Sequence, residues 1–139
     1  MALYPETIFR LMGDRGLLLE FGDEISPEVN EKVRGMTLAI QAESIEGIVE
    51  IVPTYRSLLI LYNPLILSID DLKKRLERIE KELQQTPFPE PKLTRIPALY
   101  GGSYGPDLEE VAKYHQISTE EVIQLHCSKP YFIYMIGFM

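Results

Sequence analysis

Three prolines, Pro87, Pro89 and Pro91, fall within five residues and strongly limit how this chain can fold. Each proline removes a backbone hydrogen-bond donor, so neither a helix interior nor a central strand can run through the segment. We therefore expect a stiff linker here. It separates an N-terminal domain over residues 1–88 from a second part, residues 89–139, that begins with the linker.

The residues before the prolines predict two hairpin-plus-helix units. Small and polar residues at 13–16 join two apolar runs, as in a β-hairpin. Ser26 and Pro27 then begin a helix, because a serine caps free amides and proline suits the first helical turn. Its apolar residues recur at spacings of three and four: Val29, Val33, Met36 and Ile40.

A second hairpin is predicted over residues 48–62, and a second helix after Ser68, which has Asp71 three residues on. The charged residues of this helix predict a solvated face with helical ion pairs. The order β-β-α-β-β-α predicts an α+β fold: a four-stranded antiparallel sheet with both helices on one face.

The second part begins and ends on strand-like residues. KLTRIPALYGG, residues 92–102, and PYFIYMIGFM, residues 130–139, predict strands. Between them we expect helices over residues 107–115 and 118–126, with capping boxes formed by Asp107 with Glu110 and by Ser118 with Glu121. The last run ends without a turn, so we expect this second domain to be incomplete.

Charge and cysteine content exclude several classes of function. The chain has 21 acidic and 14 basic residues, and a net charge of −7 repels nucleic-acid phosphates. Cys127 is the only cysteine, which excludes an intramolecular disulfide and a cysteine-based zinc site. No apolar run reaches the roughly 18 residues that would span a bilayer. We expect a soluble cytoplasmic protein without a nucleic-acid or membrane partner.

The glycine-rich loop at residues 101–105 is not a phosphate-binding loop. It lacks the Lys-Ser/Thr pair of the P-loop, and its glycines lack the dinucleotide spacing. One reading is a turn whose glycines have positive φ and whose Asp107 caps the next helix. In the other reading, its amides and the hydroxyls of Ser103 and Tyr104 line a ligand or partner surface.

The chain offers no self-sufficient catalytic or metal constellation. His126 and Cys127 are neighbours whose side chains point in different directions, unlike a catalytic Cys-His pair. The acidic pairs Asp23-Glu24 and Asp70-Asp71 lack a third ligand nearby in sequence, so we predict no metal site. Composition and spacing alone do not name a function.

Five patterns, in order, resemble the family of KipI and the 5-oxoprolinase B subunits, also described as allophanate hydrolase subunit 1. They are GDRGLLLEFGDEI, Asn30, GIVEIVPTYRSLLILYNP, IPALYGGSYGPDLEEVA and LHCSKPYFIYMIGF. The fourth pattern is the most specific and is carried by Pro97, Tyr100, Gly101, Gly102, Tyr104, Gly105, Pro106, Asp107 and Leu108. His126, Tyr131, Gly137 and Phe138 carry the fifth.

The resemblance implies that residues 89–139 are the opening of a cyclophilin-like β domain. It also implies a non-autonomous subunit of an ATP-dependent 5-oxoprolinase, which opens the lactam of 5-oxoproline to give glutamate. Its expected partners are a KipA-type or C subunit and a third, A, subunit. This chain alone would bind no cofactor, and the complex would use ATP.

The same family includes an inhibitor that binds the helical dimerisation domain of a sensor histidine kinase, and this remains the alternative. A polar pocket where Asp107 and His126 converge would favour the enzyme subunit. An open aromatic surface around Tyr100, Tyr104 and Phe132 would favour the inhibitor. No residue is assigned a catalytic role. The candidates for a substrate or partner surface are Tyr100, Gly101, Gly102, Tyr104, Asp107, His126 and Tyr131.

Overall fold

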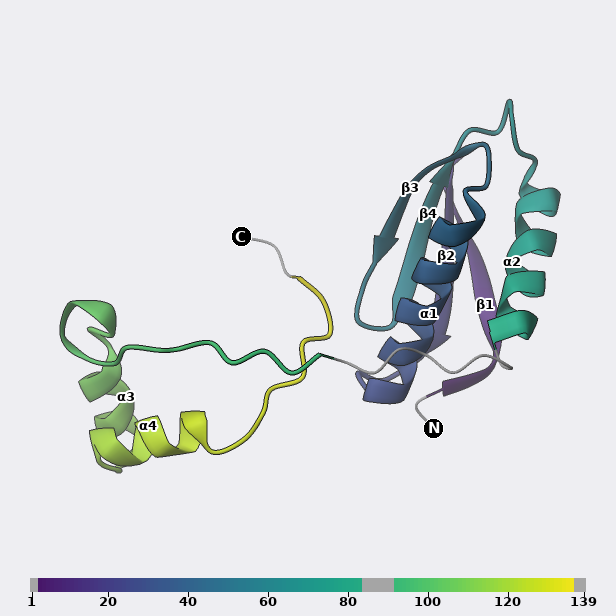
Figure 1. The fold of residues 1–139 in the computed structure, drawn as a ribbon. Helices are drawn as coiled ribbons and strands as arrows, with labels where there is room; N and C mark the ends of the chain where they lie inside the picture. Colours follow the sequence, from purple (N-terminus) through teal and green to yellow (C-terminus); the bar gives the residue numbers. More distant parts are fainter. Residues whose placement is uncertain (1–2, 84–91, 137–139) are drawn as a thin grey trace. The chain divides into compact units, whose positions relative to one another are not determined.

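The computed structural model describes residues 3–83 and 92–136, and its contacts divide the chain into two compact units (Figure 1). The sheet unit contains Met1–Pro89 and Ile133–Met139, and the helical unit contains Glu90–Phe132. The predicted proline linker lies mostly outside the described residues. The elements are β1 (Leu3–Met12), β2 (Gly16–Gly22), α1 (Pro27–Glu43), β3 (Ile48–Pro53), β4 (Ser57–Tyr62), α2 (Ile69–Leu83), a 3₁₀ turn (Gly102–Tyr104), α3 (Leu108–His115) and α4 (Thr119–Cys127).

The predicted four-stranded antiparallel sheet is confirmed, with strand order β1-β2-β4-β3. In the two central strands, Leu17 lies opposite Ile60 and Leu19 lies opposite Leu58. Alternate residues of a strand face the same side, so one side of the sheet becomes continuously apolar. The fully or almost fully buried residues of this side are Leu17, Leu19, Phe21, Leu58, Ile60 and Tyr62.

Both predicted helices pack onto that apolar side (Figure 1). The N–H of Val29 donates to Ser26 Oγ over 3.2 Å, and the N–H of Asp71 donates to Ser68 Oγ over 3.1 Å, so both predicted starts are confirmed. One hydrophobic cluster joins the sheet to the helices. The helical members are Val29, Val33, Met36, Ile40, Leu72, Leu76 and Ile79.

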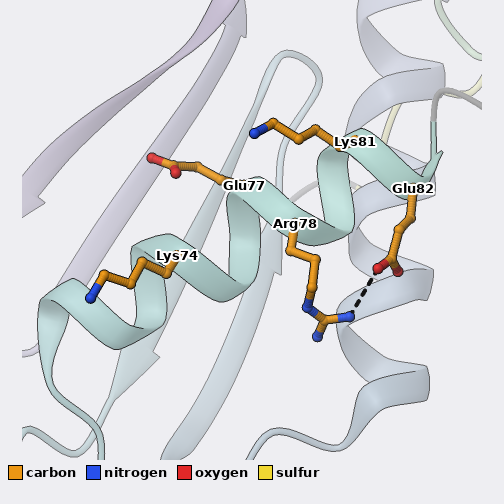
Figure 2. A pocket seen from close by; sticks show the side chains of 5 residues that line it. All are labelled: Lys74, Glu77, Arg78, Lys81 and Glu82. Atoms are coloured by element: carbon orange, nitrogen blue, oxygen red, sulfur yellow. Dashed lines mark hydrogen bonds and ion pairs between the residues drawn. The ribbon is translucent and has the colours of Figure 1, made fainter.

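The outer face of α2 carries charge, as its sequence predicted. Lys74, Glu77, Arg78, Lys81 and Glu82 line a hollow of about 380 Å³. Figure 2 shows these side chains, with Arg78 directed at Glu82. Arg78 Nη1 lies 3.1 Å from Glu82 Oε1, and Arg78 Nη2 lies 2.7 Å from Glu43 Oε1 of α1. Every lining residue is on this one helix, so we read the hollow as a solvated ion-pair surface.

Asn30 is the one buried polar side chain among the described residues, with 7% of its surface exposed. Its Nδ2 donates to the carbonyl of Tyr134 over 2.8 Å and to the carbonyl of Tyr55 over 3.4 Å. A single amide therefore connects α1, the loop before β4 and the late segment that contains Tyr134.

The two strands predicted after the linker are wrong for the residues that the structure describes. Residues 92–101 and 130–136 form no strand, and apolar side chains such as Ile96 and Ile136 are exposed. Their aromatic and β-branched residues suit a pleated, half-buried surface, but a strand also needs a hydrogen-bonded partner. Neither segment has such a partner in the described part of the chain.

The two helices of the helical unit form close to their predicted positions. The Ser118–Glu121 capping box is confirmed, because both of its reciprocal hydrogen bonds are present. The predicted Asp107 cap is wrong, since Asp107 has helical backbone angles and its side chain makes no capping hydrogen bond. A capping residue normally has extended backbone angles that bring its oxygen to the free amides. None of the helices in the described ranges is long and apolar enough to cross a membrane.

We expect Asn30→Ala to lower the free energy of unfolding by about 1–3 kcal/mol, because it removes the amide that serves two carbonyl groups. Urea unfolding followed by far-ultraviolet circular dichroism measures this loss. Gln41→Ala, at an exposed position of the same helix, is the control and should stay within about 0.5 kcal/mol. Equal losses in the two variants would contradict a special role for Asn30.

Candidate functional site

Two of the three glycines in the glycine-rich loop have the positive φ that its sequence predicted, and Gly105, with φ −159°, does not. Gly101 and Gly102 have φ values of +77° and +56°, a region that disfavours residues with a Cβ. The N–H of Tyr104 donates to the carbonyl of Gly101 over 3.2 Å, which closes the 3₁₀ turn. Tyr100 therefore lies directly before a tight, glycine-dependent turn.

Tyr100 is the centre of a small polar cluster. Its hydroxyl is hydrogen-bonded to His126 Nδ1 and lies 3.3 Å from Cys127 Sγ. The His126 ring also lies beside Tyr131, with ring centroids 5.5 Å apart. We call these four residues, Tyr100, His126, Cys127 and Tyr131, the Tyr100 cluster.

The last turn of α4 explains how two neighbouring residues reach one hydroxyl. His126 and Cys127 end this helix, and Ser118 fixes its start through the capping box. Helix neighbours were expected to point in different directions, but His126 Nδ1 and Cys127 Sγ both lie within hydrogen-bond distance of the Tyr100 hydroxyl.

The two contacts of the Tyr100 hydroxyl limit which atoms of the cluster can donate and which can accept hydrogen bonds. The Tyr100 hydroxyl has one proton to donate, and if it donates that proton to Cys127 Sγ, its oxygen accepts from His126 Nδ1–H. The proton of a neutral His126 is then on Nδ1, and Nε2 is left as an acceptor. The cluster would thus offer an imidazole nitrogen that can accept a hydrogen bond from an amide N–H.

The pKa of the Tyr100 hydroxyl is raised above its ordinary value. The hydrogen bond with Cys127 contributes most, followed by partial burial and by repulsion from the charged forms of Cys127 and Tyr131. Each of these effects favours the neutral phenol over the phenolate. Tyr100 therefore remains protonated at neutral pH.

The structure brings together three of the seven predicted surface residues: Tyr100, His126 and Tyr131. Gly101 and Gly102 shape the adjoining loop. Tyr104 is 75% exposed, and no hydrogen bond or ion pair links Asp107 to His126 within the described residues. The polar pocket expected from Asp107 and His126 is therefore not formed by a direct contact between them.

Cys127 was not among the residues predicted for the site. Its adjacency to His126 was the only sequence signal, and adjacency argues against a direct pair. The connection depends on Tyr100, which lies 26 positions before His126. Among the described residues, no group of three or more His, Cys, Asp or Glu side chains is arranged to hold a metal ion.

Comparison with known proteins gives one family and several relatives. A family profile described as "Carboxyltransferase domain, subdomain C and D" matches residues 7–139. The B subunit of the Bacillus subtilis 5-oxoprolinase is 34% identical over 137 residues, which cover 91% of this chain and 57% of that protein. The chain thus spans little more than half the length of this relative.

Solved structures agree with the fold. A conserved uncharacterized protein from Pyrococcus horikoshii is 40% identical, with a TM-score of 0.53 over 95% of this chain and 60% of that one. A crystal structure of the protein TTHA0988 is 33% identical, with a TM-score of 0.75 over 88% of this chain and 24% of that one.

We expect Cys127→Ala to lower the pKa of Tyr100 towards its ordinary value, because the variant removes both the sulfur partner and the repelling thiolate. A pH titration of the Tyr100 ring by ¹³C NMR measures the change. Ser128→Ala is the control, since Ser128 Oγ donates to the carbonyl of Leu125 instead. An unchanged Tyr100 pKa in Cys127→Ala would contradict the described hydrogen bond.

Proposed function

The chain belongs to the family described as carboxyltransferase domain, subdomain C and D, and from this premise we propose that it acts in the B subunit of a 5-oxoprolinase. This membership agrees with the family that the sequence motifs predicted. The observation that carries the proposal is the 34% identity with the Bacillus subtilis protein over 91% of this chain. The reaction is the ATP-dependent opening of the lactam of 5-oxoproline to give glutamate.

The chemistry of a lactam explains why such a subunit would not act alone. An unstrained amide needs activation of its carbonyl, and phosphoryl transfer from ATP supplies that activation when charged groups stabilise the transferred phosphoryl group. The Tyr100 cluster has a neutral hydroxyl, an imidazole and a thiol, and Lys129 Nζ lies 5.8 Å from the ring centroid of Tyr131. One ammonium over an aromatic ring, with no metal-ligand group among the described residues, does not make a phosphate-binding site. We therefore assign ATP and the phosphoryl chemistry to the complex.

The Tyr100 cluster supports a positioning role within that complex. Tyr100 would fix the His126 ring so that its Nε2 accepts a hydrogen bond from the lactam N–H of the substrate. Tyr104 and Asp107, both exposed in the adjoining loop, would contact another subunit of the enzyme. The proposed partners are a KipA-type or C subunit and an A subunit, in the cytoplasm.

Exposed aromatic side chains support a second candidate function. Tyr104 and Tyr131 are 75% and 57% exposed, and Phe132 is exposed as well. Aromatic residues are enriched at protein interfaces, and an inhibitor needs such a surface rather than a catalytic group. The second candidate is therefore a KipI-like inhibitor that covers the helical domain of a sensor histidine kinase.

The test is 5-oxoproline-dependent ATP hydrolysis by the A and C subunits. They are assayed alone, with this chain, and with a version extended to the length of its relatives. We expect the extended version to restore turnover. Tyr100→Phe in that version should lower kcat/KM about tenfold, because the variant loses the hydrogen bond that fixes His126. Tyr114→Phe on α3, whose ring contacts His115, is the matched control.

Two results would count against the enzyme proposal. If the three subunits assemble but the extended version restores no turnover, the 5-oxoprolinase role fails, and autophosphorylation of a sensor histidine kinase becomes the next readout. If Tyr100→Phe and Tyr114→Phe behave alike, the positioning role of Tyr100 fails while the subunit role stands.

A further inference from the structure

A second cavity lies in the sheet unit, where the start of β1, the N-terminal half of α1 and the last turn of α2 meet. Its volume is about 440 Å³, within the range of about 300–1,000 Å³ that is usual for small-molecule sites. It shares no residue with the Tyr100 cluster, which belongs to the helical unit. It is therefore a separate candidate for binding.

Much of the lining of this cavity is apolar. Leu3 and Pro5 come from β1, Met36 from α1, and Leu83 from the end of α2. Met36 is fully buried and belongs to the hydrophobic core, so one side of the cavity is continuous with the core. The pairing of β1 with β2 is irregular between Leu3 and Ile8, and the β1 lining residues lie within this irregular stretch.

One wall of the cavity is a fixed ion pair. Lys32 Nζ lies 2.6 Å from Glu80 Oε1, and the Thr7 hydroxyl donates to the same oxygen over 2.5 Å. The Lys32 ammonium also lies over the ring of Phe21, 5.4 Å from its centroid. Lys32 is therefore held and neutralised by its neighbours, which leaves little attraction for an anionic ligand.

Two further carboxylates face the cavity from α1. Glu28 and Glu31 have neither a hydrogen bond nor an ion pair with any residue that the structure describes. They are three positions apart, so they share one face of the helix. The cavity lining thus has three carboxylates, Glu28, Glu31 and Glu80, against the single ammonium of Lys32.

We propose that this cavity binds a small organic cation, an ammonium or guanidinium group on an apolar body. The apolar body packs against Leu3, Pro5 and Leu83, where it displaces water from apolar surface. The cationic group lies at the carboxylates of Glu28 and Glu31. An anion of the same size is repelled, and a neutral molecule lacks the electrostatic attraction. This binding role goes beyond the proposed hydrolase function and does not depend on it.

The test uses the 139-residue chain and three probes of equal length: hexylammonium, 1-hexanol and hexanoate. Two-dimensional ¹H–¹⁵N NMR follows each titration. We expect hexylammonium to bind saturably, with the largest shifts at the amides of residues 28–36 and 80–83. It should bind about fivefold or more tightly than 1-hexanol, and raising the salt concentration should reduce this preference, because salt screens exposed charges.

Isosteric variants locate the cation. Glu31→Gln should weaken hexylammonium binding about two- to fivefold, as expected for the loss of one exposed ion pair, and Glu28→Gln with Glu31→Gln should weaken it further. Glu46→Gln, at an exposed acidic position outside the cavity, is the matched control and should leave binding unchanged. Thermal unfolding of each variant checks that the fold is intact.

Several outcomes would overturn the proposal. The proposal fails if hexylammonium produces no saturable shifts, or if hexanoate or 1-hexanol binds equally well. It also fails if the shifts fall outside the cavity residues, or if Glu31→Gln and Glu46→Gln bind alike. None of these outcomes bears on the assay with the A and C subunits.

Discussion

The pairing of β2 with β4 is the constraint on which the rest of the sheet unit depends. Leu17 opposite Ile60 and Leu19 opposite Leu58 place the largest apolar side chains of both central strands on one side. A shift of one residue in this register would turn all of them to the other side. Both helices must therefore cover the same side, and their charged faces turn outward, where Arg78 connects the end of α1 to α2. The cavity lies at the border of this arrangement, where the pairing of the edge strand β1 becomes irregular.

The helical unit differs from the sheet unit, because a glycine turn and a capped helix position its Tyr100 cluster and a hydrophobic core does not. Of the residues described in this unit, only Ala112 is a buried hydrophobic residue. Such a cluster can orient hydrogen-bonding groups, but it cannot exclude water from a reacting carbonyl. Under the proposed 5-oxoprolinase role, chemistry on a lactam at this place would need further residues to exclude water, as expected of a subunit that works only within a larger assembly.

Local signals predicted most of the sheet unit. Ser26 and Ser68 cap helices through amides within three residues, and the turn at residues 13–16 joins strands that are adjacent in sequence. The predictions that were wrong depended on distant partners or on one backbone angle. Residues 92–101 have the composition of a strand but no partner in the described part of the chain, and Asp107 has capping spacing but helical backbone angles. The Tyr100 cluster and the cavity each require residues from separate elements, and no spacing in the sequence indicates such a meeting.

The hydrogen bond from Asn30 to the carbonyl of Tyr134 joins residues that are 104 positions apart. The entropic cost of closing a chain loop grows only slowly with its length, so this separation adds little to the thermodynamic cost. Its main effect is on the order of events during synthesis, which proceeds at about 5–20 residues per second from the N-terminus. The strands and helices up to Leu83 leave the ribosome several seconds before Tyr134 does. During that interval Asn30 has only the carbonyl of Tyr55, over 3.4 Å, and must otherwise bind water. During this interval, the one buried polar side chain among the described residues is incompletely hydrogen-bonded in the nascent sheet unit. The interval ends when the carbonyl of Tyr134 becomes available.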